Sequence, residues 1–314
     1  MFTSSSTDQA GCRQRLIPFL ALSRTPHGII DMAAPVMAAL LYLGHFPPLP
    51  IIIVGLITVF AGYTAIYALN DLVDIRIDKE KISLGGYHET ETDLDGILIR
   101  HPLAKGVVAY SAGLTWAVLW AVVAMAGAYW LNPICLFMFL TGALLEAVYC
   151  KLFQVTPLRT VVNGIVKSIG SLAAVVAVAP QPPLFFLGLL FLWIFFWEIG
   201  GQNIPNDWTD IEEDRLFNAR TVPLSLGPHR AGLTIMGCLV TAFFLHMALL
   251  WTSPLAFNVV LMLIAVTANY FLLLQPGLLL VSRKSRQRAM ALFNRASYYP
   301  LVTLLLVLAA IVIK

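Results

Sequence analysis

The stretch NDLVDIRID at residues 70–78 returns in altered form at residues 206–214, which read NDWTDIEED. Both stretches follow the pattern N-D-x-x-D-I-x-x-D, although only 12% of the chain is charged. Chance repetition is a poor explanation for five matching positions, three of them aspartates. On a helix, residues three and four apart share one face, so the aspartates of each stretch project together. Each motif therefore predicts a row of carboxylates.

The composition around these motifs is that of an integral membrane protein. Of 314 residues, 59% are hydrophobic, and the mean hydropathy is +0.81. A soluble domain would carry about twice this charged fraction. The net charge of +3 gives no basis for a nucleic-acid partner, and four cysteines without C-x-x-C spacing predict neither a zinc site nor a disulfide framework. We expect an all-α membrane protein with a single transmembrane domain over residues 1–314.

Nine apolar runs are long enough to cross a bilayer. They lie near 27–45, 49–69, 106–129, 132–150, 160–180, 183–203, 230–252, 255–275 and 295–313. Lys and Arg gather in the connections on one side, while HFPP, LNP, PQPP and TSP on the other side contain none. Because cytoplasmic loops are enriched in Lys and Arg, we expect the N-terminus and both motifs on the cytoplasmic side of the cell (inner) membrane. The motifs then fall in cytosolic loops 70–105 and 204–229.

Closely spaced carboxylates repel one another, so a cation is expected between them. Mg²⁺ binds through one or two carboxylates and completes its shell with water and substrate phosphates. Two motifs at equivalent helix ends thus predict two Mg²⁺ ions bridged by a substrate diphosphate. The alternative, a solvated acidic surface beside the membrane, does not explain the pairing. The predicted metal ligands are Asn70, Asp71, Asp74, Asp78, Asn206, Asp207, Asp210 and Asp214.

A second likeness follows the two motifs. RHPLAKG begins at Arg100, and RTVPLSLG begins at Arg220. Each half of the chain therefore offers aspartates, then an arginine, then a Pro-Leu pair. Such doubling is typical of a weak internal repeat, with a binding site where the two halves meet.

The paired motifs and the nine helices resemble the UbiA superfamily of intramembrane prenyltransferases. Members typically show N-D-x-x-D-x-x-x-D after the second helix and D-x-x-x-D after the sixth. Residues 70–78 match the first pattern, and Asp210 with Asp214 matches the second. The stretches SRTPHGIIDMAAPVMAALLYLG and DIEEDRLFNARTVPLSLG also look like family segments. The resemblance implies a nine-helix bundle whose central cavity opens to a cytosolic cap.

Two features depart from the family pattern. An acidic insertion, GGYHETETDLDG at residues 85–96, precedes RHPLAKG, and His101 is an extra residue between the arginine and the proline. The family also tends to place a tyrosine and then a lysine a few residues later after the fourth helix. Here Lys151 follows Tyr149 closely and Arg159 comes further on, so the cation that contacts the diphosphate is left open.

The resemblance implies Mg²⁺-dependent transfer of a prenyl chain from an isoprenyl diphosphate to an aromatic small-molecule acceptor. A quinone precursor of the 4-hydroxybenzoate or naphthoate type is the favoured acceptor. Cations neutralise the departing diphosphate, although each candidate is equally a topology determinant. These catalytic candidates are Arg100, Lys105, Lys151, Arg159, Arg215 and Arg220. Aromatic faces stabilise an allylic cation, and the candidates are Tyr63, Tyr67, Tyr149, Trp193 and Trp197.

Polar residues inside the predicted spans are hypotheses for the substrate site. Glu198 and Gln202, four residues apart, are expected to line the cavity, with Lys167 countering charge there. A purely structural Glu–Lys pair is the alternative. Arg24 and His27, at the mouth of the first helix, are candidates to receive an acceptor carboxylate. His246 is expected to be a hydrogen-bonded core residue.

Other functions remain open at this point. The same fold could act on haem, chlorophyllide or, in polyprenyl-phosphate phosphoribosyl transfer, a lipid phosphate. A CDP-alcohol phosphotransferase needs a D-G-x-x-A-R continuation that neither motif has. A secondary transporter would place its charges at the membrane midplane on broken helices, whereas these motifs sit at helix ends. Membrane lipids are the expected partners of the basic run at residues 283–288.

Overall fold

The structure, a computed structural model, describes residues 16–83, 98–179 and 181–313. Within these residues nine helical segments are long and apolar enough to cross a membrane, which confirms the predicted fold class and helix number. The elements are α2 (Thr25–Asp31), α3 (Ala33–Leu43), α4 (Leu49–Ser83), α5 (Tyr110–Leu131), α6 (Pro133–Lys151), α7 (Arg159–Val178), α8 (Leu184–Trp197), η2 (Glu198–Asn203), α9 (Ile204–Thr209), α10 (Ile211–Leu216), α11 (Val222–Thr252), α12 (Val259–Asn269), η3 (Tyr270–Leu274), α13 (Gln275–Arg283), α14 (Arg286–Ser297) and α15 (Tyr299–Ile313).

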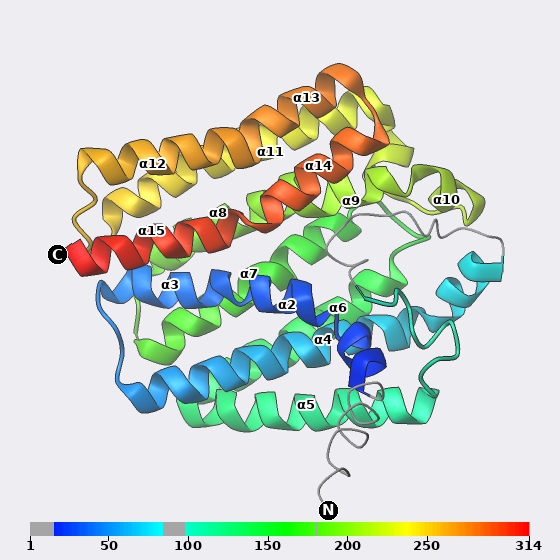
Figure 1. The fold of residues 1–314 in the computed structure, drawn as a ribbon, viewed down its shortest axis with the longest axis horizontal. Helices are drawn as coiled ribbons and strands as arrows, with labels where there is room; N and C mark the ends of the chain where they lie inside the picture. The colour runs from blue at the N-terminus through cyan, green and yellow to red at the C-terminus, as the bar shows by residue number, and fades with distance from the viewer. Residues whose placement is uncertain (1–15, 84–97, 180, 314) are drawn as a thin grey trace, which may run out of the picture.

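The spanning helices lie side by side along the long axis of the molecule (Figure 1). α4 packs against α5, α6 against α7, and α8 against α11, while α3 joins the two halves by packing on α7 and α15. The last turns of α4 and the short helix α10 lie at the same end of the bundle, on the right of Figure 1. The two aspartate motifs therefore meet at one end of the molecule.

Helix α4 is longer than the sequence pattern indicated. It runs for 35 residues, from Leu49 to Ser83, which corresponds to about 50 Å of helix. The hydrocarbon core of a bilayer is only about 30 Å thick. The expected loop at 70–105 therefore begins as helix, because the polar segment 70–83 continues the spanning helix beyond the apolar run. The first motif is held on this rigid extension.

The sixth span changes geometry where its polar residues begin. α8 passes into the π-helical turn η2 at Glu198 and then into α9. A π turn inserts extra backbone into a helix and redirects side chains, and such turns are frequent at functional sites. Gly200 lets η2 approach α11 closely, since a Cβ there would lie 2.7 Å from the Cβ of Cys238 and 3.1 Å from the carbonyl oxygen of Ile235.

Two other boundaries differ from the expected ranges. α11 begins at Val222 and kinks at Gly227, which has a φ of 76° and is followed by Pro228. The last span begins at Arg286 instead of near residue 295, because α14 leads into α15. The side chain of Arg286 donates to the carbonyl oxygen of Thr209 at 2.8 Å. At least this member of the basic run at 283–288 thus contacts protein, whereas we expected lipid headgroups.

The core between α8, α11 and α15 contains the polar residue expected there. His246 is fully buried and stacks on Trp193, with ring centroids 4.7 Å apart. Its Nδ1 lies 2.8 Å from Nδ2 of Asn269 and 2.7 Å from the hydroxyl oxygen of Tyr299. His246 is therefore a hydrogen-bonded core residue, as expected. Trp193 belongs to the same core, and this corrects its assignment as a substrate-facing aromatic residue.

Candidate active site

Both aspartate motifs line one cavity of about 600 Å³. All eight predicted metal ligands border it: Asn70, Asp71, Asp74, Asp78, Asn206, Asp207, Asp210 and Asp214. Apolar residues such as Phe46, Leu131 and Leu308 border it as well. The cavity therefore combines an acidic region at the motifs with a wall suited to a hydrocarbon chain.

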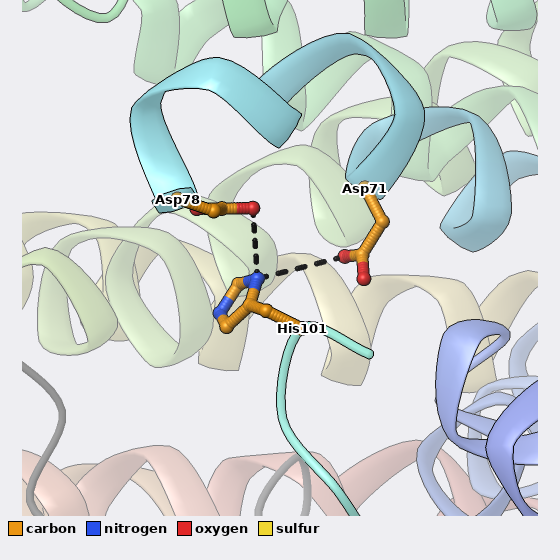
Figure 2. A group of neighbouring side chains, drawn as sticks. All are labelled: Asp71, Asp78 and His101. Atoms are coloured by element: carbon orange, nitrogen blue, oxygen red, sulfur yellow. Dashed lines mark ion pairs between the residues drawn. The ribbon is translucent and has the colours of Figure 1, made fainter. Parts of the chain in front are cut away.

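The first motif forms a compact group with a histidine. The ligand atoms of Asp71, Asp78 and His101 all lie within 4.8 Å of one another. Figure 2 shows the imidazole of His101 pointing between the two carboxylates. Its Nδ1 lies 2.8 Å from Oδ2 of Asp78 and 3.8 Å from Oδ1 of Asp71. Asp74 lines the cavity but is outside this group.

Two further side chains hold the start of this motif. Nη2 of Arg24 donates to Oδ1 of Asn70 at 3.4 Å and to Oδ1 of Asp71 at 3.5 Å. Asn70 in turn donates to Oε1 of Glu146 at 2.7 Å. Arg24 was expected to receive an acceptor carboxylate, but in the structure it contacts the aspartate motif. Glu146 was not identified from the sequence.

The carboxylates of the second motif are paired with buried cations. Nη2 of Arg159 lies 2.7 Å from Oδ1 of Asp207, and Nζ of Lys81 lies 3.2 Å from Oδ1 of Asp214. Burial raises the pKa of Asp214 to about 7, against the lowering effect of Lys81. Lys81 stands at the end of α4, three residues after Asp78. This ion pair therefore joins the two motif-bearing segments.

The donor set fits a divalent cation in both halves. Oδ2 of Asp207 is buried and has no hydrogen-bond partner within the described part of the chain. The first motif offers the group formed by Asp71, Asp78 and His101. Carboxylate oxygens are the ligands that Mg²⁺ prefers. The second motif therefore offers a free carboxylate oxygen on Asp207, and the first offers a group of ligand atoms that lie close together. Both can bind a divalent ion.

The candidate cations separate into two groups. Arg100 and Arg159 line the cavity. Lys105, Lys151, Arg215 and Arg220 are exposed and are not among the residues that line it. Lys81, which was not among the candidate cations, also lines the cavity. Its spacing of three residues from Asp78 on one helix was the signal that could have identified it.

Three of the candidate aromatic residues line the cavity: Tyr63, Tyr67 and Tyr149. The rings of Tyr63 and Tyr67 stack with centroids 6.2 Å apart. The guanidinium of Arg159 lies 4.6 Å from the ring centroid of Tyr149, whose hydroxyl accepts from Nδ2 of Asn203 at 3.0 Å. Trp197 is buried and its indole donates to the carbonyl oxygen of Ala296.

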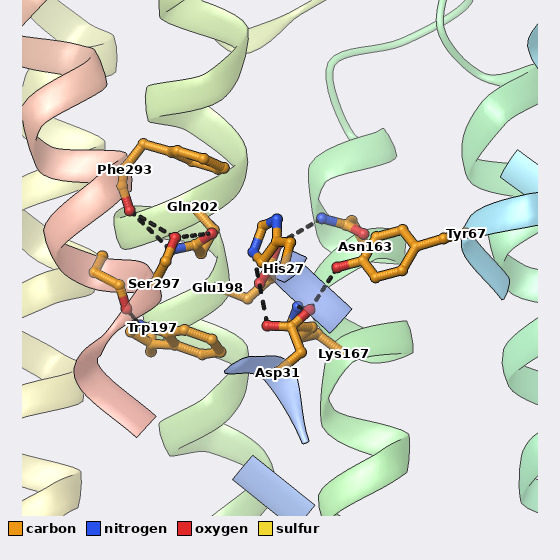
Figure 3. Close-up of polar contacts among 11 residues, drawn as sticks. His27, Asp31, Tyr67, Asn163, Lys167, Trp197, Glu198, Gln202, Phe293 and Ser297 are labelled. Carbon is orange, nitrogen blue, oxygen red and sulfur yellow. Dashed lines mark hydrogen bonds and ion pairs between the residues drawn. The ribbon is translucent and has the colours of Figure 1, made fainter. Parts of the chain in front are cut away.

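A polar network lies further along the cavity wall (Figure 3). Oδ2 of Asp31 accepts from Nζ of Lys167 at 2.5 Å and from the hydroxyl of Tyr67 at 2.5 Å. Nε2 of His27 lies 3.8 Å from the other oxygen of Asp31. We expected Lys167 to counter charge in the cavity, with a structural Glu–Lys pair as the alternative. Its ion-pair partner is Asp31, which the sequence analysis missed.

Glu198 and Gln202 both line the cavity, but their hydrogen bonding differs. The amide of Gln202 donates to the carbonyl oxygen of Phe293 at 3.2 Å and to the hydroxyl of Ser297 at 3.0 Å. Oε1 of Glu198 accepts from Nδ2 of Asn163 at 2.8 Å, whereas Oε2 is buried without a hydrogen-bond partner among the described residues. Figure 3 shows the two side chains on neighbouring turns. Oε2 of Glu198 can therefore accept a hydrogen bond from a ligand. The amide nitrogen of Gln202 already donates to Phe293 and Ser297.

These features define a class: an integral membrane helix bundle with one intramembrane cavity between two acidic motifs. The chain belongs to the UbiA prenyltransferase family, whose family model matches residues 32–301. It is therefore a prenyltransferase. A comparison of the sequence with curated proteins finds no match.

Solved structures of the same fold cover nearly the whole chain. The apo structure of a UbiA homologue from Aeropyrum pernix K1 has a TM-score of 0.71 and 20% identity, and covers 91% of this chain and 97% of its own. A UbiA homologue from Archaeoglobus fulgidus, bound to DMAPP and Mg²⁺, has a TM-score of 0.67 and 16% identity. It covers 94% of this chain and 99% of its own. A digeranylgeranylglyceryl phosphate synthase has the same TM-score and identity, and covers 96% of this chain and 100% of its own.

The acidic insertion at 85–96 lies outside the described residues.

Proposed function

We propose that this prenyltransferase transfers the prenyl chain of an isoprenyl diphosphate to an aromatic acceptor of the quinone-precursor type. One observation supports this most strongly: both aspartate motifs face a single cavity whose remaining wall is largely apolar. A diphosphate matches the acidic region once divalent ions are bound, and a prenyl chain matches the apolar wall. The Archaeoglobus fulgidus homologue bound to DMAPP and Mg²⁺ supports the same substrate class.

Two Mg²⁺ ions are proposed at the motifs. Asp71, Asp74 and Asp78 with Asn70 would hold one, and the residues of the second motif would hold the other: Asn206, Asp207, Asp210 and Asp214. When bound, Mg²⁺ supplies charge neutralisation for the leaving diphosphate. Arg100 and Arg159 line the same cavity and add positive charge there.

The chain's aromatic side chains have a defined part in this reaction. Loss of the diphosphate leaves positive charge on the allylic end of the prenyl chain. Tyr63, Tyr67 and Tyr149 line the cavity, and aromatic rings attract a cation most strongly where water is excluded. These rings would also keep water away from the cation, which favours attack by the acceptor over hydrolysis.

Glu198 is the proposed contact for the acceptor. Its Oε2 is a buried hydrogen-bond acceptor without a protein partner in the described residues, so a hydroxyl group of the acceptor can donate to it. Arg24 and His27 line the same cavity. A carboxylate of the acceptor would lie toward Arg24, because Oε2 of Glu198, unpartnered among the described residues, repels an anion at the other end.

The direct test is an assay of the purified protein in detergent with radiolabelled geranyl diphosphate and a panel of acceptors. The panel contains 4-hydroxybenzoate, a dihydroxynaphthoate and a glyceryl phosphate ether. Mg²⁺-dependent labelling of an aromatic acceptor supports the proposal. Labelling of only the glyceryl phosphate ether would overturn the aromatic acceptor while keeping the diphosphate site.

Substitution of the motifs tests the metal role. Asp71→Asn and Asp210→Asn are each expected to lower Mg²⁺-dependent product formation by about 100-fold or more, since a carboxylate ligand is lost at a charged site. Size-exclusion elution and circular dichroism should match the unsubstituted protein. Full activity in both variants would contradict the metal role of the motifs.

The cell (inner) membrane, with both motifs on its cytoplasmic side, is the proposed location. The uneven distribution of Lys and Arg between the two sets of connections supports this orientation. Isoprenyl diphosphates are charged and water-soluble at one end, so a mouth on the cytoplasmic side gives them direct access.

A further inference from the structure

His101 places a ring nitrogen within the group formed with Asp71 and Asp78 (Figure 2). We propose that His101 coordinates the divalent ion together with Asp71 and Asp78, so that this half of the site binds Mn²⁺, Co²⁺ or Zn²⁺ better than an all-oxygen site would. The inference rests on the proposed function only in requiring a divalent ion at the first motif. It adds a residue outside both aspartate motifs and a metal preference.

The distances around His101 suit coordination. In an octahedral site with ligands about 2.1 Å from the ion, adjacent ligand atoms lie about 3 Å apart and opposite ones about 4.2 Å apart. Nδ1 of His101 is 2.8 Å from Oδ2 of Asp78 and 3.8 Å from Oδ1 of Asp71. Small side-chain movements would therefore place all three atoms around one ion.

The backbone fixes the imidazole in this position. His101 has a φ of 50°, in the left-handed region that residues other than glycine rarely adopt. Its carbonyl oxygen accepts from the backbone N–H of Lys105 at 3.0 Å, and that of Pro102 accepts from Val107 at 2.9 Å. These bonds hold a tight turn beside α4. Such an arrangement is maintained only where the surroundings determine it, and it is common at ligand sites.

The chemistry of imidazole sets the expected preference. Mg²⁺ favours oxygen ligands, whereas imidazole nitrogen suits Zn²⁺ and other first-row transition ions. An ion held by one imidazole and two carboxylates keeps open positions for diphosphate oxygens or water. His101 therefore broadens the choice of metal without removing the diphosphate contact. The opposing explanation is that His101 only pairs with the carboxylates and leaves them when an ion binds.

Pulsed electron paramagnetic resonance of bound Mn²⁺ separates the two explanations. The purified full-length protein is loaded with Mn²⁺, and coupling of the electron spin to a directly bound ¹⁴N nucleus is measured. We expect this coupling in the unsubstituted protein and its loss in His101→Gln. His229→Gln is the matched control, because His229 is exposed and is not among the residues that line the cavity; its spectrum should not change.

Metal affinities, measured by isothermal titration, give the second readout. His101→Gln should weaken Mn²⁺ binding by about tenfold or more, and Mg²⁺ binding by less than about threefold. Equal losses for both ions, or Mn²⁺ coupling to nitrogen that persists in His101→Gln, would overturn the inference.

The controls distinguish the possible failures. If neither Mn²⁺ nor Mg²⁺ binds the unsubstituted protein even with geranyl diphosphate present, the metal role in the proposed function fails. If Mn²⁺ binds without nitrogen coupling, only the role of His101 fails. Should His101→Gln not fold, growth with ¹⁵N-histidine answers the question in the unsubstituted protein, because a bound imidazole then shows ¹⁵N coupling in place of ¹⁴N.

Discussion

Individual carboxylate oxygens carry much of the functional information at the residue scale. Oε2 of Glu198 and Oδ2 of Asp207 are buried without hydrogen-bond partners in the described part of the chain. Leaving such an atom unpaired costs about 1–3 kcal/mol, and more for a charged group. Gln202, one turn from Glu198, is fully engaged by Phe293 and Ser297. The contrast favours Glu198 as the residue that contacts a substrate.

Glu198→Gln tests this assignment with minimal change of shape. The amide oxygen can still accept from Asn163, but a donor replaces the acceptor at Oε2. We expect kcat/KM for a hydroxylated acceptor to fall about 10- to 100-fold, since a hydrogen bond to a charged group is lost. Binding of geranyl diphosphate with Mg²⁺ should stay within about twofold.

The matched control removes a charge elsewhere. Glu80 is exposed near the end of α4 and is not among the residues that line the cavity, so Glu80→Gln should leave kcat/KM unchanged. An acceptor whose hydroxyl is methylated should react equally fast with Glu198→Gln and with the unsubstituted protein. The ratio of kcat/KM for the hydroxylated acceptor to that for its methyl ether should be smaller in Glu198→Gln. If this ratio is the same as in the unsubstituted protein, Glu198 does not accept a hydrogen bond from the hydroxyl.

At the scale of elements, the π-helical turn η2 connects packing to function. It begins at Glu198 and is held against α11 by the close approach at Gly200. On the other side of the cavity, the extension of α4 carries Asp71 and Asp78, and its Lys81 reaches Asp214 beside α10. The site is therefore built on helices whose positions are fixed by packing, as a precise constellation requires.

Gly200→Ala tests the packing of η2. The added methyl would meet the Cβ of Cys238 at 2.7 Å and the backbone oxygen of Ile235 at 3.1 Å, so η2 and α11 must separate. We expect a loss of about 1–3 kcal/mol in the free energy of unfolding, measured by denaturation in mixed detergent micelles. Gly237→Ala in α11 is the control, since its Cβ meets nothing within 4 Å, and it should be neutral or stabilising by up to about 1 kcal/mol. Equal effects of the two substitutions would show that η2 and α11 separate at no cost.

At the scale of the whole molecule, the described chain divides into an acidic end and an apolar body. Seven of the nine spans line one cavity, all except Val222–Thr252 and Val259–Arg283, and both motifs lie at the same end (Figure 1). The connections at that end carry the lysines and arginines. A charged diphosphate can thus enter from water while its chain stays within the bilayer.

Cysteine labelling of intact cells tests the orientation. The described native cysteines, Cys135, Cys150 and Cys238, are buried, and Cys12 is replaced by serine in the background. Gln181→Cys is expected to react with a membrane-impermeant maleimide about tenfold or more faster than Lys151→Cys, because the Lys- and Arg-rich side faces the cytoplasm. Both positions are exposed, so both should react after permeabilisation. The reverse order would place the motifs outside the cell.

The sequence by itself determined the class of fold, the number of spans and the two acidic motifs. Hydropathy and charge act locally, because each spanning helix must satisfy its own backbone hydrogen bonds in lipid. The helix boundaries were less certain, as the continuation of α4 to Ser83 shows. A row of aspartates that follows an apolar run has no signal of its own to end the helix.

Only the tertiary structure decided the partners. Lys167 pairs with Asp31 across 136 positions of sequence, and Lys81 pairs with Asp214 across 133. Arg24 contacts the first motif, and His101 enters it. Such pairs depend on how each helix is rotated and packed against its neighbours. That information belongs to the surfaces of several helices together, so no single segment of the sequence contains it.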